Sequence, residues 1–199
     1  MQTEEVIRTR RSTRRFSDRP VEEEKLEKIL QAANQAPSGG NSRTCRLFVI
    51  RSRKVLEDLA QIAQRAFAAM EYDENTYRSK RNSIAKAKQG HYVFHYQPAA
   101  LIVTVNQRSH PNALVDCACA LENMMLMANE LDLGSCYINQ PHWLDEDPEL
   151  RAYLARYGLT EEETICGSLA VGYADTPDGL PNRMGAPKEP LAVTWIDEP

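Results

Sequence analysis

The chain contains the run Ala99-Ala100-Leu101-Ile102-Val103-Thr104-Val105, which is almost wholly apolar and rich in β-branched residues. Pro98 and Asn106 bound this run, and both residue types are uncommon inside strands. A strand that carries apolar side chains on both faces has to be covered on both faces. The run therefore predicts a buried central strand.

The segment from Pro111 to Leu131 is the most hydrophobic helix that the sequence predicts. Its apolar residues occupy almost the whole circumference of the helix, and a helix of that kind cannot lie on a surface that faces water. We expect it either in the centre of the fold or at a subunit interface. Its alanine and cysteine positions allow close backbone approach, and its methionines are interpreted as core residues.

Apolar periodicity predicts the remaining elements. Helices are expected at residues 3–9, from about 20 to 35, and at 54–70 and 148–157; strands are expected at 47–50, 135–138, 166–173 and 191–196. Residues 71–96 have weak periodicity and are interpreted as irregular helix and loop, which forms either a lid or substrate wall or a mobile surface segment. Residues 139–142 are expected to form a polar turn. Residues 175–199 contain five prolines and are expected to be extended.

Composition limits the class of protein. The 199 residues, of which 42% are hydrophobic and 26% charged, predict one globular domain that spans residues 1–199. A net charge of -4 argues against a nucleic-acid partner. With no signal peptide and no run near the ~18 apolar residues of a membrane span, we expect a cytoplasmic protein without membrane contact. Five scattered cysteines and four histidines lack zinc-type spacing, so no metal is predicted.

The charge is reversed in one short stretch, Arg8-Thr9-Arg10-Arg11-Ser12-Thr13-Arg14-Arg15-Phe16, which holds five arginines. Guanidinium groups and a hydroxyl within about one turn are the donors that a phosphate needs. A solvated basic face or a nucleic-acid patch is the alternative. The acidic balance of the whole chain favours a small anion at this stretch.

A second stretch with functional potential is Ala36-Pro37-Ser38-Gly39-Gly40-Asn41-Ser42. Its residue types give a loop with free backbone amides and permissive dihedral angles. Loops of this kind approach planar or anionic ligands closely, although a simple turn between a helix and a strand has the same composition.

Four segments together resemble the FMN-dependent nitroreductase family in order and spacing: residues 10–16, 36–41, 116–138 and 167–172. The resemblance covers nearly the whole chain. It implies an α+β, nitroreductase-like fold with a central, mostly antiparallel sheet flanked by helices. It also implies an intertwined homodimer, in which a C-terminal arm of about residues 175–199 embraces the partner subunit.

The same resemblance implies which residues bind FMN. Those expected to hold the phosphate and reach the pyrimidine edge of the flavin are Arg10, Arg11, Ser12 and Arg14. Those expected to approach the same flavin from the other subunit are Pro37, Ser38, Gly39 and Asn41. The ring is expected to lie against Ile138, Asn139 and Gln140, and Lys188 is expected to complete the phosphate site. No catalytic side chain is predicted, because flavin N5 carries the chemistry.

The implied activity is hydride transfer from NADH or NADPH, through the flavin, to a small oxidised acceptor such as a nitroaromatic, a quinone or a flavin. Two alternatives stay open: a flavin-fragmenting or reductively dehalogenating enzyme on the same scaffold, and a flavin-binding module without turnover. The chain departs from the family pattern at two places. Ser42-Arg43-Thr44-Cys45 stands where x-Gln-Pro-Trp is common, and Asn139-Gln140 replaces the usual glycines. The acceptor is therefore left open.

Overall fold

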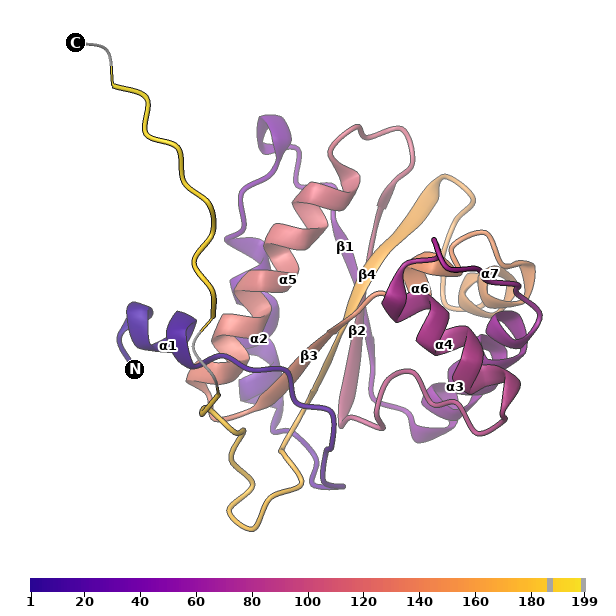
Figure 1. Ribbon diagram of the computed structural model, residues 1–199, viewed down its shortest axis with the longest axis horizontal. Helices are drawn as coiled ribbons and strands as arrows, with labels where there is room; N and C mark the ends of the chain where they lie inside the picture. Colours follow the sequence, from indigo (N-terminus) through magenta and orange to yellow (C-terminus); the bar gives the residue numbers. More distant parts are fainter. Residues whose placement is uncertain (186–187, 198–199) are drawn as a thin grey trace.

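A four-stranded sheet forms the centre of the computed structural model, which describes residues 1–185 and 188–197 (Figure 1). Its strands follow the order β1 (Arg46–Ile50), β2 (Ala100–Gln107), β4 (Glu163–Gly172) and β3 (Gly134–Ile138). Neighbouring strands pair in the antiparallel direction throughout. The predicted α+β fold with an antiparallel sheet and a central strand near residues 99–105 is confirmed.

Helices cover both faces of the sheet (Figure 1). On one face lie α2 (Glu23–Asn34) and α5 (Ala113–Glu130), with α1 (Thr3–Thr9) packed against α5. On the other face lie α3 (Arg53–Ala68), α4 (Arg78–Lys88), α6 (Gln140–Trp143) and α7 (Pro148–Ala155). Each layer encloses its own apolar core.

Strand β2 divides its side chains between these two cores. Leu101 and Val103 belong to the core under α3 and α7, whereas Ala100 and Ile102 belong to the core under α2 and α5. Successive side chains of a strand point to opposite faces, so a run without polar interruption fills both layers. The apolar stretch of the sequence is thus the element that both helical layers share.

Helix α5 is apolar on two sides. Its inner side packs into the core through residues such as Leu121 and Met124, which confirms the expectation that its methionines contribute to the core. Leu114 and Val115 lie on its outer side and are 49% and 63% exposed in the single chain. This apolar surface is covered by nothing else among the described residues.

Two segments differ from the sequence-based expectations. Residues 78–88 form a regular helix, whose period is weak in the sequence because only Ser83, Ile84 and Ala87 are buried. Of the predicted polar turn at 139–142, residues 140–142 instead lie in the short helix α6, since a proline fits the first turn of a helix.

The predicted strand at residues 191–196 pairs with no other strand among the described residues. It runs away from the body of the fold (Figure 1). The predicted arm of about 175–199 also includes positions 186–187 and 198–199, which lie outside the described residues.

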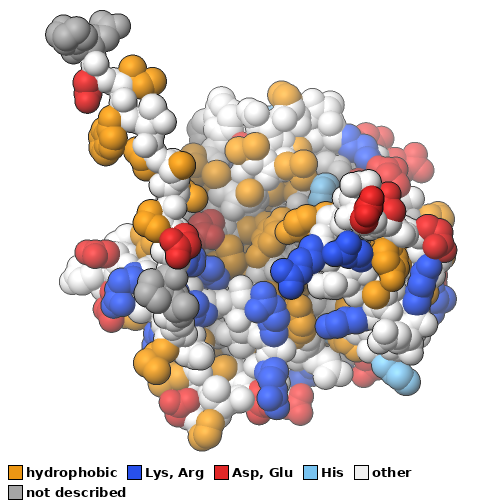
Figure 2. All heavy atoms as spheres, in the orientation of Figure 1, with side chains coloured by type: hydrophobic (Ala, Val, Ile, Leu, Met, Phe, Trp, Pro, Cys, Tyr) orange, Lys and Arg blue, Asp and Glu red, His pale blue; other side chains and the backbone are white. Residues whose placement is uncertain are grey.

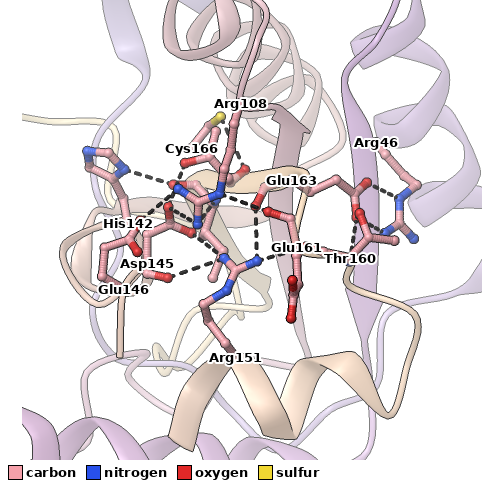
Figure 3. Close-up of polar contacts among 12 residues, drawn as sticks. Arg46, Arg108, His142, Asp145, Glu146, Arg151, Thr160, Glu161, Glu163 and Cys166 are labelled. Atoms are coloured by element: carbon pink, nitrogen blue, oxygen red, sulfur yellow. Dashed lines mark hydrogen bonds and ion pairs between the residues drawn. The ribbon is translucent and has the colours of Figure 1, made fainter. Parts of the chain in front are cut away.

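A buried carboxylate joins the segment between α6 and α7 to strand β4 (Figure 3). Asp145 accepts hydrogen bonds from the Ile165 N–H at 2.8 Å and from the Thr164 hydroxyl at 2.7 Å. Its oxygens also lie 3.1 Å from the guanidinium nitrogens of Arg108 and Arg151. The carboxylate is therefore both charge-paired and fully hydrogen-bonded.

Two negative findings concern the described residues 1–185 and 188–197. No helix there combines the length and the apolar character needed to cross a bilayer. No three His, Cys, Asp or Glu side chains there are arranged to hold a metal ion.

We expect Asp145→Ala to lower the free energy of unfolding by about 3–5 kcal/mol, because it leaves two partly buried guanidinium groups without their shared partner. Urea unfolding followed by circular dichroism measures the change. Glu149→Ala is the matched control: it removes a solvent-screened surface pair with Arg65 and should leave the free energy of unfolding nearly unchanged. An equal loss of unfolding free energy in the two variants would contradict the conclusion that Asp145 stabilises the fold through its buried contacts.

Candidate functional site

The arginine-rich segment lies along the edge of the sheet. The Thr13 N–H donates to the carbonyl of Ser135 in β3 at 2.8 Å, and Phe16 forms an antiparallel bridge with Ala174. The close approach requires glycine at position 134, because an added Cβ there would lie 2.7 Å from the Thr13 Oγ1. Backbone pairing therefore fixes the segment beside β3 and the end of β4.

This segment, residues 174–176 and the C-terminal arm enclose a cavity of about 600 Å³, here called the arginine cavity. Its lining residues are Arg10, Arg11, Ser12, Thr13, Arg14, Arg15, Ala174, Asp175, Thr176, Asn182, Met184 and Lys188. The fold thus brings together every residue that the sequence assigned to the phosphate. Five of the lining side chains are cationic and only Asp175 is acidic, so the cavity attracts anions.

One buried guanidinium nitrogen of the arginine cavity lacks an acceptor. Arg10 Nη1 is buried and has no hydrogen-bond partner among the described residues. Arg11 Nη1, in contrast, donates to the carbonyls of Arg8 and Arg10 at 2.8 and 2.9 Å. A buried donor without a partner costs about 1–3 kcal/mol, and more when it is charged. An anion in the cavity would remove this cost, so the residues present fit a phosphate group.

Residues 36–42 form a turn between α2 and β1, with a short 3₁₀ segment at Gly39–Asn41. Gly40 and Asn41 have φ angles of 60° and 55°, a region that glycine and asparagine tolerate best. The Gly39 N–H donates to Asp116 Oδ1 at 3.0 Å. A Cβ at Gly39 would lie 2.2 Å from Asn112 Nδ2, so the loop lies tightly against the start of α5.

This loop does not meet the arginine cavity within one chain. Pro37 and Ser38 line a different cavity, of about 230 Å³, together with Arg43, Cys45 and Asp116. The loop lies near the first residues of α5, whereas the arginine-rich segment passes the other end of that helix (Figure 1). The four loop residues predicted to bind FMN are therefore separated from the predicted phosphate ligands in the single chain.

Asp116 holds the loop and was not assigned a role from the sequence. Besides the Gly39 N–H, its carboxylate accepts from His110 Nε2 at 2.7 Å and from the Ser42 hydroxyl at 3.4 Å. The hydrogen bond from His110 is the main cause that keeps the pKa of Asp116 below its ordinary value, and the bonds from Gly39 and Ser42 act in the same direction. The sequence feature that could have indicated this role is the position of Asp116 in the first turn of α5, where an acidic side chain is favoured.

Residues 138–140 comprise the last residue of β3 and the first residues of the segment that leads into α6. The Ile138 side chain is buried in the core, so only its backbone is available to a ligand. Asn139 Oδ1 accepts from the Tyr137 hydroxyl at 2.8 Å. The amide of Gln140 donates to the Tyr92 hydroxyl at 2.9 Å and to Ser83 Oγ, on α4, at 3.2 Å. The Gln140 side chain therefore points toward α4.

Three cysteines that are scattered in the sequence meet in the fold. Cys117 Sγ lies 3.3 Å from Cys45 Sγ, and both pack with Cys166. Cys117 and Cys166 are buried, whereas Cys45 is partly exposed. No sequence spacing indicated this cluster.

Comparison with known proteins identifies the family. The model of the nitroreductase family matches residues 7–173. The chain belongs to the nitroreductase family, which confirms the prediction of an oxidoreductase of this type.

Two relatives resemble almost the whole chain. The chain is 28% identical over 228 aligned positions to the nitrobenzene nitroreductase of Ectopseudomonas oleovorans, covering 98% of this chain and 97% of that protein. It is 25% identical over 228 positions to the 4-nitrobenzoate reductase of Nocardioides sp., covering 97% and 90%.

A solved structure is also similar: a nitroreductase of Bacteroides fragilis with bound FMN. It superimposes with a TM-score of 0.83 at 30% identity and covers 99% of this chain and 100% of that one. The similarity confirms the predicted nitroreductase-like fold, and the FMN in that protein matches the cofactor expected from the sequence.

We expect Asp116→Ala to release the loop, because it removes the acceptor of the Gly39 N–H. A hydrogen bond to a charged group contributes about 1.5–3 kcal/mol, so amide hydrogen exchange at residue 39 should become roughly tenfold faster or more. In the unaltered protein the protection should persist above the ordinary pKa of an aspartate and disappear as the pH falls through the lowered pKa of Asp116.

Asp178→Ala is the control for this prediction. It removes a comparable loop acceptor, which receives the Leu180 N–H at 3.0 Å, and should leave exchange at residue 39 unchanged. Unaltered exchange in Asp116→Ala would contradict the anchoring role.

Proposed function

We propose that the chain is an FMN-dependent oxidoreductase that transfers hydride from NADH or NADPH to a small oxidised acceptor, such as a nitroaromatic or a quinone. The observation that carries this proposal is the arginine cavity, with its cationic lining and the buried, unpartnered Arg10 Nη1. The bound FMN of the similar Bacteroides fragilis protein supports the same cofactor.

The phosphate of FMN would be held by Arg10, Arg11, Arg14 and Lys188, with the Ser12 hydroxyl as a further donor. Guanidinium groups form paired, charge-assisted hydrogen bonds with phosphate oxygens, which fix orientation as well as affinity. The backbone pairing of the segment with β3 keeps these groups in place before the ligand arrives.

The flavin ring would extend from this phosphate site toward the backbone of residues 138–140. When bound, FMN supplies the two-electron chemistry that connects a nicotinamide donor to an oxidised acceptor. The protein positions the ring, and a guanidinium directed at its pyrimidine edge stabilises negative charge there. No nucleophile or acid–base side chain is required by this reaction.

The working unit would be a homodimer. In a symmetric pair, Pro37, Ser38, Gly39 and Asn41 of one chain would approach the arginine cavity of the other. The exposed apolar side of α5, with Leu114 and Val115, supports an interface along that helix.

The C-terminal arm supports the same assembly. Leu191, Trp195 and Ile196 are more than four-fifths exposed, at 89%, 83% and 88%. Strand β1 is an edge strand with a partly exposed Val49, and a mostly apolar groove of about 230 Å³ lies beside it. The arm of a partner would add a strand to this edge, which accounts for the strand predicted at 191–196.

The two relatives, a nitrobenzene nitroreductase and a 4-nitrobenzoate reductase, support nitroaromatic acceptors, one neutral and one a carboxylate. Anaerobic titration of the purified yellow protein with NADH and NADPH, followed by a panel of acceptors, tests the proposed activity. Bleaching of the flavin and reoxidation by a nitroaromatic or a quinone is expected. A flavin that neither cofactor bleaches would contradict turnover, and loss of FMN itself would indicate a fragmenting enzyme.

We expect Arg10→Ala to raise the Kd for FMN about 10- to 100-fold, because one charge-assisted hydrogen bond to the phosphate is lost. Flavin fluorescence during titration of the apoprotein measures the change. Arg8→Ala is the control, since that exposed side chain does not line the cavity, and it should change the Kd less than about twofold. Equal Kd values in the two variants would refute the assignment of Arg10.

A further inference from the structure

Helix α4 carries a concentration of positive charge that the proposed function does not explain. Its sequence RSKRNSIAKAK holds five cationic residues and no acidic one, although the whole chain has a net charge of -4. Among the described residues only Lys88 pairs with a carboxylate, that of Glu71 at 3.0 Å. The cations of the first turn, Arg78, Lys80 and Arg81, have no ion pair with any described carboxylate.

These three cations do not stabilise the helix. The first turn of a helix favours acidic side chains, because its free N–H groups carry partial positive charge. Helix α4 has no acid in that turn, and Arg78 and Arg81 are like charges three residues apart. Their placement costs a little helix stability, so helix formation does not account for it.

The first half of α4 stands beside the end of β3, where the flavin ring is proposed to lie. Ser83 of α4 accepts the hydrogen bond from Gln140, and Tyr77 meets the Trp143 ring edge-on at 6.0 Å. Lys and Arg side chains cover both α4 and the arginine-rich segment on the same face of the molecule (Figure 2). The proposed FMN phosphate accounts for the cations of the arginine-rich segment. The cations of α4 are available to a second anion.

We propose that Arg78, Lys80 and Arg81 form an anion subsite that binds the carboxylate or phosphate of the molecule docking on the open face of the flavin. The inference rests on the proposed function, because that function puts the ring beside α4. The anion could belong to the acceptor, as a carboxylate on an aromatic ring, or to the donor, as the extra phosphate of NADPH. Both are recognised by the same guanidinium chemistry.

Binding of benzoate and of benzamide tests the subsite directly, since the two probes share a ring and differ in charge. Isothermal titration calorimetry on the purified protein reports each Kd. We expect benzoate to bind more tightly than benzamide. The double variant Arg78→Gln/Arg81→Gln should weaken benzoate about five- to tenfold and benzamide less than about twofold. Added salt should weaken benzoate binding selectively, because Arg78 is exposed and Lys80 and Arg81 are partly exposed.

Lys88→Gln is the matched control. It removes one positive charge from the far end of the same helix, where Glu71 already pairs with it, and should leave both Kd values unchanged. Circular dichroism confirms that each variant keeps the fold.

Steady-state kinetics then distinguish the two sources of the anion. A rise of KM for NADPH but not NADH in the double variant assigns the subsite to the donor. A rise of KM for 4-nitrobenzoate but not nitrobenzene assigns it to the acceptor. Either result supports the subsite.

The absorption spectrum separates this inference from the proposed function. Yellow protein that binds the two probes equally, before and after the double substitution, would overturn the subsite alone. Colourless protein that still prefers benzoate through Arg78 and Arg81 would support the subsite and contradict FMN binding. Colourless protein without that preference would overturn both.

Discussion

The burial of β2 on both faces is the constraint on which the rest of the structure depends. Because its side chains fill two cores, a helical layer has to cover each side of the sheet. The arginine-rich segment pairs with the first residues of β3, through Ser135. The other layer brings α4 to the residues that follow β3, through Gln140 and Ser83. The two cationic groups thus lie near the two ends of β3, along which the flavin is proposed to extend.

The surfaces that a single chain leaves unsatisfied are of two kinds. The polar one is the arginine cavity, where the buried Arg10 Nη1 lacks an acceptor. The apolar ones are the outer side of α5 and the C-terminal arm, where Val115 and Trp195 are 63% and 83% exposed. In the arginine cavity, the free-energy cost of a buried donor without an acceptor favours the binding of an anion. On the outer side of α5 and on the C-terminal arm, the hydrophobic effect favours contact with a second copy of the chain. The proposed cofactor binding would satisfy the polar surface, and the proposed dimerisation would cover the apolar ones.

The sequence predicted the elements whose burial leaves a strong periodic pattern, such as β2 and α5, and short motifs placed the arginines. Arg15, which the sequence does not assign to the phosphate, lines the arginine cavity but is solvent-exposed and lies 3.5 Å from the carboxylate of Asp175. The sequence did not indicate that α4 is a regular helix, because few of its side chains are buried and its apolar period is therefore weak. The anchoring of Gly39 by Asp116 joins residues 77 positions apart, and local patterns carry no information about such contacts.

The most direct test of a site shared by two subunits is the FMN content of a mixed dimer. One subunit would carry Arg10→Ala, and the other would carry Gly39→Leu, whose side chain would displace the loop from Asn112. Each homodimer should bind FMN poorly. The purified heterodimer should hold one FMN, because one of its two sites combines the intact arginine cavity with the intact loop. A heterodimer as empty as both homodimers would contradict the account, since it would mean that each site lies within one chain.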